Sequence, residues 1–107
     1  MSYFRAIVKD GRTPIVAGTD MPFSLTASKA MHDELEYMVM AGMTPFEAIK
    51  AATTTAAKAI GQDGSLGSID EGKIGDIILL NCDPTIDITC LKRRGKTVIQ
   101  WGRVVSE

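Results

Sequence analysis

Apolar residues follow one another without a break in the stretch Ile15-Val16-Ala17, just before Gly18, Thr19 and Asp20. An uninterrupted apolar run of this kind predicts a short parallel strand that is buried on both faces, because a half-exposed strand alternates apolar and polar positions. Such a strand would carry the carboxylate of Asp20 to its C-terminal end, where α/β proteins collect their catalytic groups. The rest of the chain is expected to support this strand.

Apolar side chains recur at helical spacing after this stretch. The first helix is predicted to begin at Thr26 or Ser28, either of which can cap it, and to run to about Ala41. Its apolar stripe consists of Met31, Leu35, Met38 and Gly42. The segment Thr44-Pro45-Phe46-Glu47 then combines a capping threonine, a proline at the first helical position and the glutamate of a capping box. These signals predict a second helix that continues to Ile60.

The composition changes after Gly61. Residues 62–75 carry four glycines and are predicted to be loop, and Asp76–Leu80 is predicted to be a strand. Thr97–Gln100 and Arg103–Val105 flank Trp101-Gly102, which favours a β-hairpin. We therefore expect two units: residues 1–61 with one strand and a helix pair, and residues 62–107 as a small C-terminal β section.

Charge and cysteine usage narrow the classes of function. The 107 residues include 12 basic and 13 acidic side chains, so no overall field attracts nucleic acid or an anionic membrane. The apolar runs are too short to cross a bilayer. Cys82 and Cys90 form no Cys-x-x-Cys pair, which predicts two free, inert thiols in a cytoplasmic protein. No nucleic-acid or membrane partner is expected.

Asp20 is the candidate for chemistry. A carboxylate at a strand end can bind a divalent metal and accept a proton from the metal-bound water, although a catalytic zinc site needs about three protein ligands. The chain has one histidine, His32, which could pair with Glu36 one helical turn away but is more simply a packed or surface residue. The basic run Lys92–Lys96 is typical of a solvated loop, with an anion site as the alternative.

Four stretches together resemble the C-terminal end of amidohydrolase-superfamily metal hydrolases, in particular the imidazolonepropionase-like and Xaa-Pro dipeptidase-like branch. They are Pro14–Asp20; His32–Leu35 with Ala41–Pro45 and Glu47–Ile49; Ala52-Thr53 with Ala57; and Gly67–Asp76 leading into the final strands. They span nearly the whole chain in the family's order, whereas Gly-Thr-Asp alone would be a weak signal.

The resemblance implies an α/β fold: the C-terminal fragment of a (β/α)8 barrel together with part of the small β-sandwich beside it. Ile15–Ala17 would be the last barrel strand, Ser28–Ile60 the helices after it, and Asp76–Val105 the share of the sandwich. Gly75 stands where the family often has alanine. Of the family's metal ligands only the aspartate of the last strand carries over, as Asp20, which would be both metal ligand and catalytic residue. The resemblance implies a divalent metal, zinc, in the full-length family, and no metal is expected for this chain alone.

Two hypotheses about function remain open. In the first, the chain is part of a metal-dependent amidohydrolase that hydrolyses C–N bonds of small cyclic amides or dipeptides and is inactive alone, because a full barrel needs roughly 250 residues. In the second, it is a truncated, non-catalytic domain that acts through self-association or partner binding. Unpaired strand edges predict that the chain is a homo-oligomer or that its partner is the missing N-terminal barrel portion.

Overall fold

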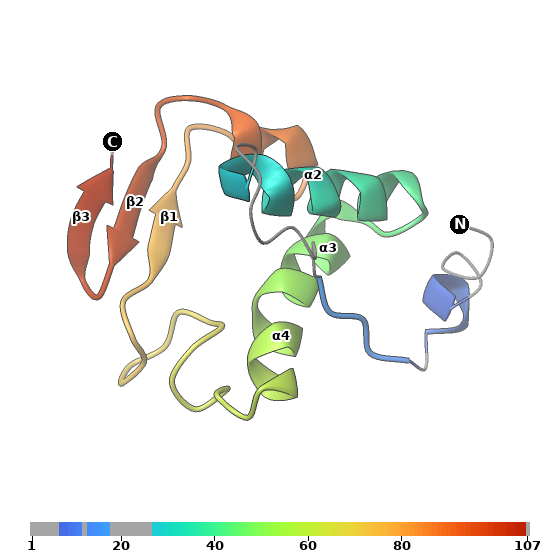
Figure 1. Ribbon diagram of the computed structural model, residues 1–107, viewed down its shortest axis with the longest axis horizontal. Coiled ribbons are helices and arrows are strands. Elements are labelled where there is room, and N and C mark those ends of the chain that lie inside the picture. The colour runs from blue at the N-terminus through green and yellow to red at the C-terminus, as the bar shows by residue number, and fades with distance from the viewer. Residues whose placement is uncertain (1–6, 12, 18–26, 107) are drawn as a thin grey trace.

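The computed structural model describes residues 7–11, 13–17 and 27–106 of the chain. A three-stranded sheet lies at one end of the molecule, the helices of residues 27–59 lie in the middle, and the N-terminal segment runs from a short helical turn at the other end back to these helices (Figure 1). Residues 7–10 are helical. None of the helices in these described ranges combines the length and the apolar character needed to cross a membrane.

The first long helix, α2, spans Ala27–Met40 and confirms the predicted element. Leu35 and Met38 are buried, as the apolar stripe predicts, while Met31 lies on the exposed side. Gly42 has a φ of 122°, and the backbone N–H of Met43 donates to the carbonyl of Met38. Glycine adopts this positive φ without steric penalty, so the helix ends where the sequence indicates.

The second predicted helix begins as expected but is not continuous. α3 spans Pro45–Ala52, and its capping box is complete: Glu47 N–H donates to Thr44 Oγ1 at 3.1 Å, and Thr44 N–H donates to Glu47 Oε1 at 3.0 Å. The predicted single helix to Ile60 is wrong, because Thr53 (φ −122°, ψ −90°) interrupts it. Its hydroxyl donates to the carbonyl of Ile49 at 2.7 Å, a side-chain bond that competes with helical geometry. α4 then spans Thr54–Ala59.

Gly67 packs against this interruption. A Cβ at Gly67 would lie 2.7 Å from the Cβ of Ala57 and 2.9 Å from the carbonyl oxygen of Thr53. The φ of Gly67 is +94°, which L side chains rarely adopt. The loop after α4 therefore approaches the α3–α4 junction at a point where only glycine fits.

The core forms between α2, α3 and a short 3-10 helix, η1, that spans Ile88–Lys92. Its buried members are Leu35, Met38, Met43, Ala48, Ala51 and Ile88. The small side chains of Ala48 and Ala51 are fully buried, which lets α3 pack closely against the core residues of α2. Ile88 comes from the predicted C-terminal unit and packs with the helices of the N-terminal unit, so the two share one core. Their separation as domains at residue 61 stays a prediction.

The predicted strand at Ile15–Ala17 does not form in the described residues. Residues 14–17 belong to no ladder, and Val16 is 44% exposed. A segment is a β-strand only when its backbone forms hydrogen bonds with a neighbouring strand. Among the described residues, the sheet contains only the three later strands. The expectation of a strand buried on both faces is therefore wrong for this chain.

The C-terminal strands confirm the predictions. β1 (Ile77–Leu79), β2 (Thr97–Gln100) and β3 (Arg103–Ser106) form an antiparallel sheet in the order β1-β2-β3. Val98 pairs with Ile78 on one side, and Ile99 pairs with Val104 on the other. Consecutive side chains of a strand point to opposite faces. Because Val104 and Val105 are both more than half exposed, β3 presents apolar side chains on both faces.

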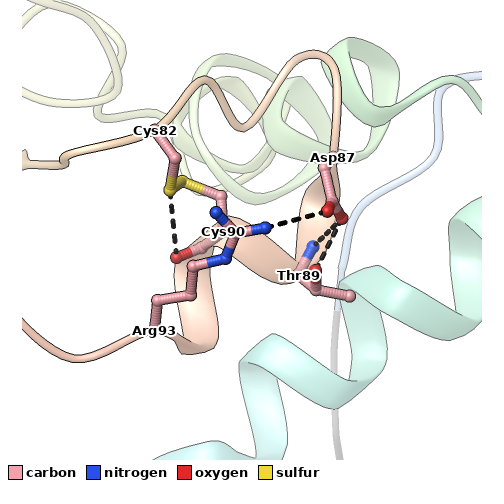
Figure 2. A network of polar contacts seen from close by, with 5 residues as sticks. All are labelled: Cys82, Asp87, Thr89, Cys90 and Arg93. Atoms are coloured by element: carbon pink, nitrogen blue, oxygen red, sulfur yellow. Dashed lines mark hydrogen bonds and ion pairs between the residues drawn. A yellow bond between two sulfur atoms is a disulfide. The ribbon is translucent and has the colours of Figure 1, made fainter.

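The two cysteines form a disulfide, so the prediction of two free thiols is wrong (Figure 2). The chain folds back between Cys82 and Cys90: Asp83 accepts hydrogen bonds from Thr85, and Asp87 caps η1 by accepting from the backbone N–H of Thr89 at 3.0 Å. This local geometry brings the sulfur atoms together without a Cys-x-x-Cys motif. In the chain-entropy model, closing a loop of this size contributes about 2–3 kcal/mol to stability.

The turn between β2 and β3 contains Trp101, whose backbone has a positive φ that is unusual for a bulky side chain. Trp101 and Gly102 have φ values of 53° and 76°, so both central positions of the turn are left-handed, as in a type I′ turn. Trp101 N–H donates to Asp76 Oδ1 at 3.0 Å, and Gly102 N–H donates to the carbonyl of Gly75 at 2.9 Å. These bonds hold in place a bulky residue whose ring is largely exposed and contributes little packing.

We expect Trp101→Asn to stabilise the chain by about 0.5–1 kcal/mol, because asparagine tolerates a left-handed backbone better than tryptophan does. The backbone bond to Asp76 is unchanged by this substitution. Urea unfolding followed by circular dichroism measures the effect. Gln100→Asn, on the extended strand beside the turn, is the matched control and should give no gain. A Trp101→Asn variant less stable than the original chain would contradict the assignment of backbone strain to Trp101.

Candidate functional site

Asp20, the sequence-predicted catalytic and metal-binding residue, lies outside the described residues. The segment leading to it is described as far as Ala17. The backbone N–H of Ala17 donates to the carbonyl of Ala51 at 3.1 Å, which attaches this segment to α3. Helix α3 and its capping box therefore position the chain three residues before Asp20.

A cavity of about 150 Å³ lies beside this segment. Its lining comes from both sides of the gap between the N-terminal residues and α3: Ile7, Val8, Gly11, Thr13, Ile15, Met43, Glu47 and Lys50. The two charged side chains already have contacts. The hydrogen bond from the Thr44 backbone N–H lowers the pKa of Glu47, and the Lys50 ammonium lies 5.7 Å from the centre of the Phe46 ring. Both groups thus make contacts at or within α3.

His32 lies on α2, half-buried, close to the charges that join α2 to η1. Burial lowers its pKa from the ordinary 6.5, because an imidazolium is poorly solvated there. The positive charges of Lys96 and Lys92 lower the pKa further, and Asp33 opposes them. A neutral imidazole can bind a metal, but the charged neighbours of His32 are two lysines and one carboxylate, which is not a set of metal ligands.

Glu36 pairs with Lys92. The half-buried position of His32 agrees with the simpler prediction of a packed residue rather than with the alternative of a His32–Glu36 pair. Lys92 Nζ lies 2.6 Å from Asp33 Oδ1 and also contacts Glu36 Oε2, so one ammonium binds two carboxylates of α2. The hydrogen bonds that the Lys92 ammonium donates to Asp33 and then to Glu36 raise the pKa of Lys92 well above its usual value. Sequence reasoning assigned Lys92 to a solvated basic run and missed this contact, which no local pattern indicates.

A catalytic metal site requires several ligand side chains to lie close together. No three side chains of histidine, cysteine, aspartate or glutamate converge within these ranges. The described residues therefore do not fit a catalytic metal, which needs about three protein ligands.

Comparison with known proteins identifies the family. The sequence profile of the amidohydrolase family matches residues 3–105. The chain belongs to the amidohydrolase family. It is thus a member of a hydrolase family, and the predicted resemblance is confirmed. Amidohydrolases generally use divalent metals.

Two curated relatives and one solved structure illustrate the match. The imidazolonepropionase of Geobacillus kaustophilus is 36% identical over 100 residues, covering 90% of this chain and 23% of that protein. The ochratoxinase of Aspergillus niger is 41% identical over 101 residues, covering 92% of this chain and 20% of that protein. The crystal structure of a Xaa-Pro dipeptidase with methionine bound in its active site has a TM-score of 0.85 at 32% identity, covering 99% of this chain and 25% of that one.

The chain therefore spans about a fifth to a quarter of the length of these relatives. Its mixture of helices and strands is that of the corresponding part of an amidohydrolase fold. The relatives' remaining three quarters have no counterpart in this sequence, so the match supports the family and the fold of this segment.

We expect the pKa of His32 to lie below 6.5 and to rise in Lys96→Gln, because Lys96 is the largest electrostatic contributor to its depression. NMR titration of the imidazole measures it, and His32 is the only histidine, so the signal is unambiguous. Lys58→Gln, on exposed α4, is the matched control and should leave the pKa unchanged. A pKa at or above 6.5 in the original chain would contradict the structure.

The lowered pKa of His32 also makes the free energy of unfolding depend on pH. The folded chain favours the neutral imidazole, whereas the unfolded chain takes up a proton near pH 6.5. The contribution of His32 to the free energy of unfolding is thus fully present above pH 6.5. It is lost as the pH falls through the lowered pKa that His32 has in the folded chain. Unfolding free energies measured on either side of this range should show the decline, and His32→Gln should remove that part of it.

Proposed function

We propose that this chain supplies the C-terminal part of a metal-dependent amidohydrolase that hydrolyses C–N bonds of cyclic amides or dipeptides. The observation that carries the proposal is the near-complete coverage of the chain by two enzymes of this kind. Imidazolonepropionase covers 90% of it, and the Xaa-Pro dipeptidase covers 99%. The first name denotes a cyclic substrate and the second a dipeptide, which defines the proposed class of small-molecule substrate.

In this proposal residues 1–61 contribute the last strand and the following helices of a (β/α)8 barrel, and residues 62–107 contribute part of an adjoining β-sandwich. Ile15–Ala17 would become a barrel strand only when neighbouring strands from the rest of the enzyme supply its hydrogen bonds. Two features support this. Val16 is exposed although its sequence is that of a buried strand, and β3 exposes apolar side chains on both faces. A larger body would cover both surfaces.

Asp20 is the residue that would bind the metal, with zinc as the proposed ion, and serve as a catalytic carboxylate. The bound metal would supply Lewis-acid activation of water, as it does in metal hydrolases generally. This chain would contribute the carboxylate at the end of the last strand and, through the Ala17–Ala51 hydrogen bond, its attachment to α3. The other ligands would come from the missing N-terminal barrel portion, so the chain alone would be inactive.

We expect the purified chain with added zinc to hydrolyse neither an imidazolone nor an Xaa-Pro dipeptide. When the chain replaces the matching C-terminal segment of the Geobacillus imidazolonepropionase, zinc-dependent hydrolysis should appear. Asp20→Asn should then lower kcat/KM by about a hundredfold or more, since loss of a ligand exceeds the effect of losing its supporting groups. Asp63→Asn, in an exposed loop, is the matched control. Equal activity of the two variants would contradict the role of Asp20.

A second candidate function is that of a non-catalytic domain that self-associates. The exposed apolar side chains of β1 and β3 favour it, because a strand edge of this kind readily pairs with another chain. In this alternative a second copy covers the sheet in place of the rest of an amidohydrolase, and the assembly is a homo-oligomer.

We expect light scattering of the purified chain at high concentration to show a dimer or a larger assembly. Val104→Lys places a charge on the exposed edge strand β3 and should shift the equilibrium towards the monomer. Ile69→Lys is the matched control, because Ile69 is exposed and lies in the loop after α4 rather than on a strand. A monomer at every accessible concentration would exclude self-association.

A further inference from the structure

We propose that the Cys82–Cys90 disulfide is a thiol-exchange site for a small anionic thiol, which reaches the sulfur atoms through a basic cavity beside η1. The product of the first exchange is a mixed disulfide on Cys82. This proposal is independent of any hydrolase activity.

The cavity opens directly onto the disulfide. It has a volume of about 60 Å³, and its lining residues are Leu80, Asn81, Cys82, Cys90, Arg93, Arg94 and Lys96. Cys82 is half-buried, whereas Cys90 is fully buried. An incoming thiol therefore meets Cys82 first. A space of this size admits the end of a small molecule but not the active-site loop of a reducing protein.

Three cationic side chains line the cavity, and one of them is neutralised. Arg93 pairs with Asp87 at 3.1 Å, and Figure 2 shows its side chain reaching past the disulfide to that carboxylate. Lys96 Nζ donates instead to the carbonyl oxygen of Leu91 at 2.8 Å, an acceptor that carries no charge. The Arg94 side chain is exposed at the rim.

The neighbouring charges do not cancel the remaining two cations. Asp83, the other acidic residue of the loop, keeps its negative charge, because the hydrogen bonds from Thr85 lower its pKa, but it does not line the cavity. The carboxylates Asp33 and Glu36 share the single ammonium of Lys92 at the α2 contact, and they do not line the cavity either. The mouth of the cavity is thus positive, which attracts an anionic thiol and stabilises thiolate sulfur.

The exchange balances with thiol as the only co-reactant. A thiolate attacks Cys82 Sγ, a new S–S bond forms, and the Cys82–Cys90 bond breaks with its electron pair leaving on Cys90 Sγ as a thiolate. A second thiolate then attacks the sulfur of the bound small molecule and releases Cys82 as a thiolate. Two small thiols are oxidised to one disulfide, and the protein disulfide is reduced to two thiols.

The test compares three small thiols of similar size and different charge: 2-mercaptoethanesulfonate, 2-mercaptoethanol and cysteamine. Mass spectrometry follows the mixed disulfide and the reduced chain, and each rate is divided by the same thiol's rate with a neutral small disulfide. At low ionic strength we expect the anionic thiol to exceed the cationic one by about fivefold, a difference that high salt removes. Equal relative rates, or a preference for cysteamine, would overturn the proposal.

Charge reversal at the cavity mouth provides the matched comparison. Arg94→Glu should abolish or reverse the preference, whereas Arg103→Glu, with the same change in net charge on the distant edge strand β3, should retain it. Arg94→Gln, a milder variant, should reduce the preference if Arg94→Glu impairs folding. A preference unchanged in all three variants would overturn the role of the cavity. If Cys82 and Cys90 stay free thiols in the chain purified without reductant, there is no disulfide to exchange, and the proposal is overturned.

Discussion

The contact between η1 and α2 is the interaction on which the arrangement of the chain depends. Ile88 enters the core beside Leu35 and Met38, and Lys92 binds two carboxylates on the adjacent face of α2. The Cys82–Cys90 bond then links η1 to the chain leaving β1. Apolar, ionic and covalent contacts thus meet in a five-residue segment. The sheet is positioned relative to the helices through that segment.

Elements whose signals lie within a few residues could be predicted from the sequence. The capping box at Thr44–Glu47 needs only side chains three positions apart, and the hairpin needs only a turn that accepts two positive φ values. The elements that could not be predicted depend on distant residues. Ile15–Ala17 has the composition of a buried strand but lacks neighbours in the described sheet, and the break at Thr53 coincides with the close approach of Gly67.

The candidate functional residues also differ in how far the sequence alone could predict their roles and contacts. Asp20 is predicted from its position after the apolar run Ile15–Ala17 and from the order of motifs that the amidohydrolase family shares, and its role stays a prediction. The family assignment follows from nearly the whole chain. The spacing of Cys82 and Cys90 alone could not distinguish thiols from a disulfide, because the turn at Asp83 and the cap at Asp87 decide the distance between them. Lys92 likewise meets Asp33 and Glu36 only after folding, and its position in a basic run gives no indication of this.

The close fit of Gly67 changes how the glycine-rich stretch between α4 and β1 is understood. Its contact with Ala57 and Thr53, together with the hydrogen bond from Ile74 N–H to the carbonyl of Ser65, divides one long connection into shorter segments. Each segment loses less conformational entropy on closure than a single free loop of the full length. Added residues should therefore be accommodated between these fixed points and should disrupt the helix junction when they fall at Gly67 itself.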